Sequence, residues 1–289
     1  MICRARDSNA KAAQAVHRAC GVDIDEIVWF AKTFHLSNVS SIDAFLTRNP
    51  QHRDIGKALI AVCLIELEEP RLFHDERAKY DDDWYHYLWN VLIDDTNTTA
   101  DLANNKVRFI TFNYDRSLEF FLRDSTKHTY ARDRPEDHKK WSQLEILHVY
   151  GDLGKFPIGD EIAGDERNYS NKLFAPAVKI AVDRIHVMPE DRGFEETFKK
   201  TQEWCDWASR IYFLGFGFDK LNCERLGFAN ILDVRTRRGE IVEVTASAHE
   251  MTQAEFTRAK VRATGSRGKW TDPQFKKNVE TLRYGPLLV

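Results

Sequence analysis

The chain has 289 residues, enough for one large α/β domain or two small ones. Its 43% hydrophobic and 30% charged residues are typical of a globular protein, and its net charge of −3 gives no reason to expect binding to nucleic acid or a membrane surface. No apolar run approaches the ~20 residues of a membrane span, and the N-terminal residues lack a signal-peptide pattern, so we expect a cytoplasmic location.

The first hundred residues are predicted to be mostly helical. Helical spacing of apolar residues follows Ser8, Asp23 and Ser41, each of which can cap a helix, and a long buried helix is predicted between His52 and Glu68. The acidic run Asp81–Asp83 precedes another such pattern. Because acidic residues stabilise a helix start, we interpret this run as a solvated cap and not as a metal site.

Three later stretches each contain an apolar strand that breaks into glycine or polar residues. They are Val107–Leu118 (VRFITFNYDRSL), Leu144–Gly154 (LEILHVYGDLG) and Arg210–Asn222 (RIYFLGFGFDKLN). In an open α/β sheet, ligand-binding groups lie where strands end and helices begin. If the sheet is parallel, the three strand ends are therefore expected to meet at one crevice.

The remaining segments are predicted as loops, helices and one more strand. Residues 124–140 read as a charged loop with a short strand at Thr129–Tyr130. Residues 151–191 read as a long loop in which Phe174–Ala177 is a candidate to pack over a ligand. The last predicted elements are a helix over 194–208, a strand over 240–245, and helices over 254–261 and 272–282.

The strand ends contain residue types that suit a binding or catalytic site. Asn113 and Asp115 alternate, so both can point into one crevice if the backbone is extended; alternatively, Asp115 only caps the following helix. His148 can accept a proton from a hydroxyl or water near neutral pH, or it can be a core histidine bonded to a backbone carbonyl. Gly215 and Gly217 allow close approach of backbone to a ligand, or form a tight turn without one.

The same three motifs resemble those of the sirtuins, in the family's order. Thr111–Asp115 (TFNYD) is similar to the sirtuin Thr-Gln-Asn-Ile-Asp motif, and His148 near Gly151 resembles the His-Gly motif. Gly215–Phe218 stands where sirtuins have Gly-Thr-Ser. The residues of these motifs are most similar to those of divergent sirtuin-like proteins of prokaryotic antiviral defence. The resemblance covers roughly residues 40–245.

The resemblance implies an α/β fold with a Rossmann-like, mostly parallel sheet and a large helical cap. It implies one sirtuin-like domain over residues 1–289. The helical cap portion would be 1–104, the Rossmann-like core 105–250, and the C-terminal helices 251–289.

The resemblance further implies hydrolysis of NAD+ to nicotinamide and ADP-ribose, in antiviral defence by NAD depletion. Asn113 would then orient the ribose or the attacking water, Asp115 would hold the nicotinamide, and His148 would be the general base. The residues expected to contact NAD+ are Thr111, Tyr114, Gly215, Gly217, Phe218 and Asn222. The expected partners are a second copy of the chain or another defence protein, with no direct contact to nucleic acid or membrane.

No zinc is expected. The five cysteines form no Cys-x-x-Cys pair, and the histidines show no metal-ligand spacing. The cysteines are Cys3, Cys20, Cys63, Cys205 and Cys223, and we expect them to be reduced and chemically silent. The protein-deacylating sirtuins that carry four zinc cysteines are therefore a weaker comparison.

Two departures from the sirtuin pattern keep other functions open. Tyr150, not histidine, directly precedes Gly151. The first glycine, Gly21, follows no strand, so the Gly-Ala-Gly-x-Ser phosphate loop is missing from the sequence. The alternatives are a catalytically silent nucleotide-binding or scaffold subunit of a defence complex and, less favoured, an NAD-dependent protein deacylase.

Overall fold

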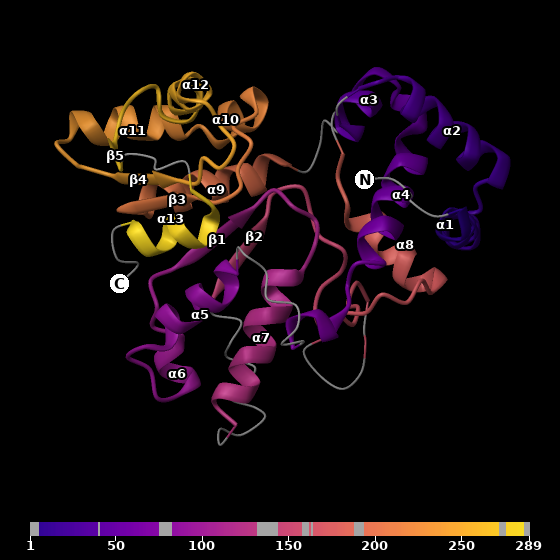
Figure 1. Ribbon diagram of the computed structural model, residues 1–289, viewed down its shortest axis with the longest axis horizontal. Coiled ribbons are helices and arrows are strands. Elements are labelled where there is room, and N and C mark those ends of the chain that lie inside the picture. Colours follow the sequence, from indigo (N-terminus) through magenta and orange to yellow (C-terminus); the bar gives the residue numbers. More distant parts are fainter. Residues whose placement is uncertain are drawn as a thin grey trace. The chain divides into compact units, whose positions relative to one another are not determined.

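The computed structural model describes residues 6–39, 41–74, 83–131, 144–157, 162, 164–187, 194–271 and 276–285. The fold is mixed α/β, with short strands among many helices (Figure 1). The chain divides into two compact units. Unit 1 is Met1–Ala78, Thr111–Phe121 and His148–Phe194, and unit 2 is Lys79–Ile110, Leu122–Leu147 and Glu195–Val289.

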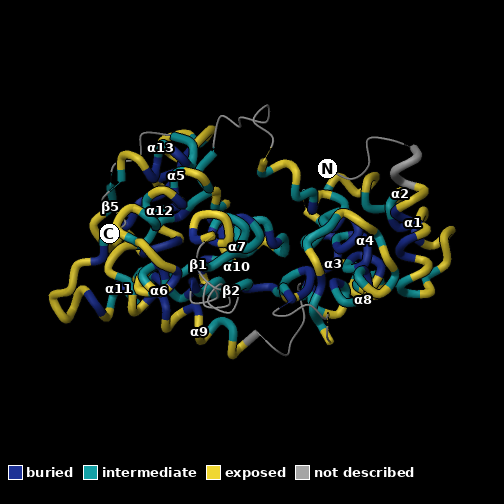
Figure 2. The backbone as a smooth tube through the Cα atoms, turned by 90° about the horizontal axis from the view of Figure 1, so that it is seen from below, coloured by how far each residue is buried: buried dark blue, intermediate teal, exposed yellow. Residues whose placement is uncertain are grey.

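The core of unit 1 is helical. Its helices are α1 (Arg6–Cys20), α2 (Ile24–Leu36), α3 (Ile42–Arg48), α4 (Arg53–Ile65) and α8 (Ala175–Arg184), with two short 3-10 turns, η1 (Pro50–His52) and η2 (Pro70–Phe73). Helices α1, α4 and α8 pack against one another. They enclose Val16, Val62, Ile65 and Val178, none of which is exposed, and Figure 2 shows the buried segments of these helices in dark blue.

The predicted caps of the first helices are confirmed. Asp23 accepts a hydrogen bond from the backbone N–H of Asp25, and Ser41 accepts one from that of Ala44. Each cap satisfies a backbone donor that has no partner within its helix. Asp83 likewise caps α5 (Trp84–Ile93), in unit 2.

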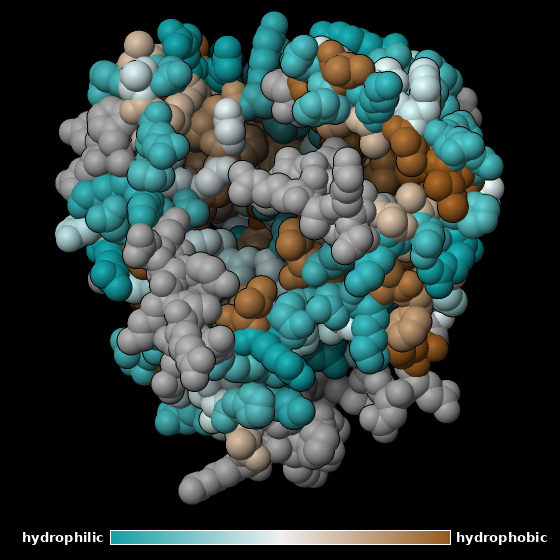
Figure 3. All heavy atoms as spheres, turned by 45° about the vertical axis from the view of Figure 1, so that its right-hand side comes forward, coloured by the Kyte–Doolittle hydropathy of each residue, from teal (hydrophilic) through white to brown (hydrophobic). Residues whose placement is uncertain are grey.

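Helix α2 also carries apolar side chains that are exposed and do not pack into the core. Ile27 and Phe30 are buried, whereas Ile24, Val28 and Leu36 are 40%, 56% and 63% exposed. Hydrophobic side chains at the surface are drawn in brown in Figure 3.

Unit 2 contains a three-stranded parallel sheet in the order β3 (Arg210–Phe213), β4 (Glu243–Ala246) and β5 (Lys269–Trp270). Parallel neighbours need a crossover connection, and helices supply it in both cases. Helices α10 (Lys220–Leu226) and α11 (Phe228–Arg237) join β3 to β4, and α12 (Gln253–Thr264) joins β4 to β5. The remaining helices are α9 (Phe194–Trp207), which precedes β3, α6 (Thr99–Leu102), and α13 (Asn278–Tyr284), which packs on α5.

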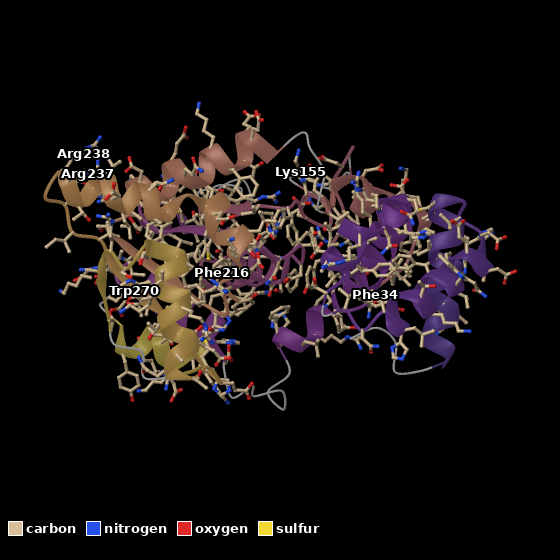
Figure 4. All side chains as sticks on the ribbon, turned by 90° about the horizontal axis from the view of Figure 1, so that it is seen from above. Phe34, Lys155, Phe216, Arg237, Arg238 and Trp270 are labelled. Atoms are coloured by element: carbon tan, nitrogen blue, oxygen red, sulfur yellow. The ribbon has the colours of Figure 1, made fainter. Side chains whose placement is uncertain are left out.

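Aromatic rings fill the core around this sheet. The ring of Phe213 on β3 lies 5.4 Å from that of Phe218 and 6.0 Å from that of Phe228, and it is stacked on Trp270 at 6.4 Å. Phe216 and Trp270 are labelled in Figure 4. The high aromatic content of the sequence is therefore used in packing.

A second, two-stranded sheet consists of β1 (Arg108–Thr111) and β2 (Glu145–His148). Helix α7 (Ser117–Thr129) follows β1 directly. The residues of β1, α7 and β2 are divided between the two units. Thr111–Phe121 and His148 belong to unit 1, whereas residues 108–110 and 122–147 belong to unit 2. The mixed α/β class is thus confirmed, and a single Rossmann-like sirtuin sheet with its helical cap stays a prediction.

Two predicted loops are partly helical. Residues 124–129 belong to α7, so the strand proposed at Thr129–Tyr130 is wrong; the buried hydroxyl of Thr126 bonds to the carbonyl of Leu122 inside the helix. The long loop contains α8, which has a proline in its first turn. Proline is tolerated there because that position lacks an intrahelical partner for its N–H, whereas in the sequence alone a proline is typical of a loop.

The other predictions of helices and strands agree with the structure to within a few residues, except that the helix predicted over 272–282 is found as α13, which begins only at Asn278. The sequence did not predict α6, α10, α11 or β5. Cys3, the side chain of Ser8, Ser40, Asp81–Asp82 and residues 132–140, 188–191 and 272–275 lie outside the described residues.

Candidate functional site

His148 is the last residue of β2 in unit 1, and its side chain is only 7% exposed. Its Nδ1 lies 2.8 Å from the backbone oxygen of Asn113, which follows β1. A carbonyl oxygen can only accept a hydrogen bond, so Nδ1 carries a hydrogen and donates it. The nitrogen that gains or loses a proton is therefore Nε2.

The Nε2 atom of His148 faces Glu119 in the first turns of α7. Glu119 Oε2 lies 3.1 Å away, and the Glu119 side chain is 18% exposed. The distance fits an ion pair between the carboxylate and a protonated imidazole. Among the described residues, both buried atoms lack a hydrogen-bond partner, so each keeps an unused hydrogen-bonding capacity.

The surroundings of His148 favour its charged form. Burial on its own lowers the pKa of the imidazole, but the Glu119 carboxylate, the charge of Asp152 and the Asn113 carbonyl together raise it above the ordinary 6.5. The protonated form of His148 therefore persists to higher pH than that of an ordinary histidine.

Asp152, four residues after the end of β2, is held in an ion-pair network. Its two oxygens each lie 2.6 Å from a nitrogen of Arg184, and one also accepts the backbone N–H of Gly154 at 2.7 Å. Arg184 also pairs with Asp165, whose carboxylate lies 3.1 Å from the amine of Lys155. Lys155 is labelled in Figure 4. Burial alone raises the pKa of Asp152, but Arg184 holds it below its ordinary value. Asp152 therefore ties the segment after β2 to the end of α8 through Arg184.

Gly151 brings the end of β2 next to the end of α8. Its φ of +85° belongs to the left-handed region, and a Cβ there would lie 1.9 Å from the backbone oxygen of Arg184. No side chain fits at this position. The backbone N–H of His186 donates to the carbonyl of Tyr150 at 3.0 Å, which holds the same two segments together.

The other predicted residues near His148 shape the turn from β1 to α7. The side chain of Asn113 is exposed, and its backbone N–H donates to the hydroxyl of Thr111. Asp115 Oδ1 accepts hydrogen bonds from the N–H and hydroxyl of Ser117, so Asp115 caps α7. The Tyr114 hydroxyl donates to the backbone oxygen of His186 at 2.8 Å, and its ring packs on the core of unit 1.

The remaining predicted residues belong to unit 2. The N–H of Gly215 (φ +60°) donates to the hydroxyl of Ser247, and Gly217 is exposed with open space where a side chain would be. Phe218 is 2% exposed and lies in the aromatic core. The N–H of Asn222 donates to Asp219, the cap of α10. Within unit 1, the structure thus places Asn113 next to His148. The turn Gly215–Asn222 belongs to unit 2.

Glu119 was missed by the sequence reasoning. It lies in the first turns of α7 (Ser117–Thr129), 29 residues before His148, and its approach to the imidazole depends on how α7 lies against the end of β2. No local pattern in the sequence marks the two as partners.

A buried charge network beneath the site was also missed. Glu68 lies between Arg116 and Arg167, and the three side chains are 1–5% exposed. Glu68 Oε1 and Oε2 each accept from Arg116 at 3.0 Å, and Oε2 accepts from Arg167 at 2.5 Å. The other guanidinium donors bond to the backbone oxygens of Leu153, Gly154, Arg167, Asn168 and Ser170. Every donor nitrogen of both arginines therefore has a partner, which indicates a structural role.

No protein-family model, curated protein or solved structure matches this chain. Within the described ranges, no group of three or more His, Cys, Asp or Glu side chains is placed to hold a metal ion. Over the same ranges, we find no helix with the length and apolar character to cross a membrane. The sirtuin resemblance therefore remains a prediction from the motifs.

Proposed function

We propose that this chain hydrolyses NAD+ to nicotinamide and ADP-ribose. The observation that carries the proposal is the close placement of Asn113 and His148, 35 residues apart in sequence, with a buried imidazole whose Nδ1 is fixed on the Asn113 carbonyl. Both residues belong to the sirtuin-like motifs. A buried imidazole with one defined titrating nitrogen is suited to accept a proton from water or from a ribose hydroxyl.

In the proposed reaction, the bond between the ribose C1′ and the nicotinamide nitrogen breaks. Positive charge develops on the ribose, and the oxygen of a water molecule forms a bond to C1′. The proton that this water loses goes to the unprotonated Nε2 of His148. Nicotinamide leaves as a neutral molecule, and the products are nicotinamide, ADP-ribose and one proton.

Asn113 and Asp115 are assigned supporting roles. The exposed amide of Asn113 would orient the water or the ribose. Asp115 uses Oδ1 to cap α7, and its Oδ2 accepts no hydrogen bond among the described residues. That oxygen would accept the N–H of the nicotinamide carboxamide, so the cap and the site role are compatible.

The test is to incubate the purified chain with NAD+ and to follow free nicotinamide. We expect release by the native chain, loss of release in Asn113→Ala and His148→Gln, and unchanged release in the control Asn230→Ala, whose side chain is exposed in unit 2. Absence of release by the native chain, or full release by Asn113→Ala, would refute the proposal.

On the basis of the motif resemblance, we propose that this activity serves antiviral defence, with a second copy or another defence protein as partner. NAD+ would then fall in infected cells that express the native chain. Measuring NAD+ after phage infection, with the Asn113→Ala variant as the comparison, tests this setting.

A second candidate is a catalytically silent nucleotide-binding or scaffold subunit. Among the described residues that precede β1, the chain forms helices and no strand followed by a glycine loop. Such a loop is the usual holder of a pyrophosphate. Calorimetry with NAD+ separates the two: binding without nicotinamide release favours the silent subunit, and turnover excludes it. An acetyl-lysine peptide in the same assay tests deacylation.

A further inference from the structure

We propose that Glu119 is a positioning residue for His148: its carboxylate stabilises the protonated imidazole, and it thereby sets the pH above which the neutral imidazole, the form that accepts a proton in the proposed reaction, is present. The statement about charge rests on geometry alone. Its consequence for catalysis rests on the proposed function, and the experiment below keeps the two separate.

The position of Glu119 is fixed by its neighbours on α7. Phe120 stacks on Tyr169 with ring centres 4.3 Å apart, and Phe121 is 3% exposed. At the start of the helix, Arg116 is anchored in the buried charge network. A residue between such anchors has little freedom, so the 3.1 Å separation between Glu119 Oε2 and His148 Nε2 is built into the fold.

Of the two acidic groups near His148, Glu119 is the one whose negative charge is not already paired with an arginine. The titratable and charged groups that face the imidazole are Glu119 on α7 and Asp152 after β2, and the Asn113 carbonyl lies on the opposite nitrogen. Asp152 is already paired through both oxygens with Arg184. Glu119 has no cation in hydrogen-bond or ion-pair contact other than His148 among the described residues.

The unused hydrogen-bonding capacity of the pair suits one kind of ligand group. A protonated Nε2 can donate, and Glu119 Oε2 can accept. A hydroxyl group, or a water molecule, both accepts and donates, so a single oxygen can satisfy the two buried atoms together. With His148 protonated, the pair is thus suited to bind a hydroxyl of the substrate or a water molecule, whereas the attacking water requires the unprotonated Nε2.

The experiment is a pH titration of the histidine ring signals by NMR, in the absence of any ligand. It uses the native chain, Glu119→Gln, Glu119→Asp and the control Glu26→Gln; Glu26 is exposed on α2. The signal of His148 is identified by its loss in His148→Gln. We expect its midpoint to move to lower pH in Glu119→Gln, to return part of the way in Glu119→Asp, and to stay in Glu26→Gln.

A His148 midpoint that does not move in Glu119→Gln overturns the proposal, whether or not the chain is active. If the native chain releases nicotinamide, the acid limb of its pH profile should move to lower pH in Glu119→Gln, in parallel with the NMR midpoint. A purely structural role of Glu119 would lower activity without moving that limb, and this outcome also overturns the proposal. Failure of the native chain to release nicotinamide refutes the proposed function and leaves the NMR result to decide on Glu119.

Discussion

Replacing Glu68 by glutamine should strongly destabilise unit 1. Glu68 is the single carboxylate between the guanidiniums of Arg116 and Arg167, and all three side chains are almost fully buried. Glutamine has nearly the same shape, so packing is preserved and only the charge and one acceptor are lost. The new NH2 group would face guanidinium donors, and two buried positive charges would lie together without a counter-charge.

Breaking a buried ion pair in this way costs about 3–5 kcal/mol, because the charge left behind stays out of water. A loss of that size lowers a melting temperature by about 10 °C for a domain of ordinary size. The matched control is Glu66→Gln, two residues earlier on the chain. Glu66 is half-buried and its side chain has no described partner, so we expect a change of about 0.5 kcal/mol or less.

The assay is urea unfolding of the native chain and both variants, followed by hydrogen exchange resolved to peptides. The two units can unfold separately, so a single transition for the whole chain is not assumed. Peptides from α4 and from the segment after β2 should lose protection in Glu68→Gln. Equal stability of Glu68→Gln and Glu66→Gln would show that the buried network contributes no net stability, and the reasoning would be wrong.

Three further predictions concern single sites. Gly151→Ala should cost about 3 kcal/mol or more, because its Cβ would collide with backbone, whereas Gly164→Ala, also at positive φ but in open space, should cost about 1 kcal/mol; urea midpoints compare them. The pKa of His148 is raised in the folded state, so the stability that Glu119 adds is full below pH 6.5 and is lost as the pH rises through the folded pKa; the difference in urea midpoint between native and Glu119→Gln should therefore be largest below pH 6.5 and shrink as the pH rises above it. Burial raises the pKa of Cys205 to about 12, so alkylation of this thiol in the folded protein should be far slower than after unfolding, as measured by mass spectrometry.

Local patterns in the sequence were enough to predict most elements. Asp23, Ser41 and Asp83 each stand before a run of apolar residues at helical spacing, and each caps the helix that follows. Caps and spacing act within a few residues, so they can be read without knowledge of the fold. Helix α8 was missed because its proline resembles a loop signal when its neighbours in space are unknown.

The buried charges could not be predicted by the same means. Glu68 lies 48 residues from Arg116 and 99 from Arg167, and charged residues are usually exposed. Nothing within a short window marks these three as partners. The approach of Glu119 to His148 has the same origin, because it depends on how α7 lies against the end of β2.

The turn from β1 into α7 is where stability and the proposed chemistry meet. Within seven residues, Asn113 meets His148 through its backbone, Arg116 points into the buried network, and Glu119 returns to His148. A variant that disturbs Arg116 is therefore expected to displace Glu119 as well, even though the two side chains contact different groups. Loss of activity in such a variant cannot by itself assign a catalytic role. Variants that alter charge without altering shape, such as Glu119→Gln, are required to separate the function of the site from the stability of the helix that forms it.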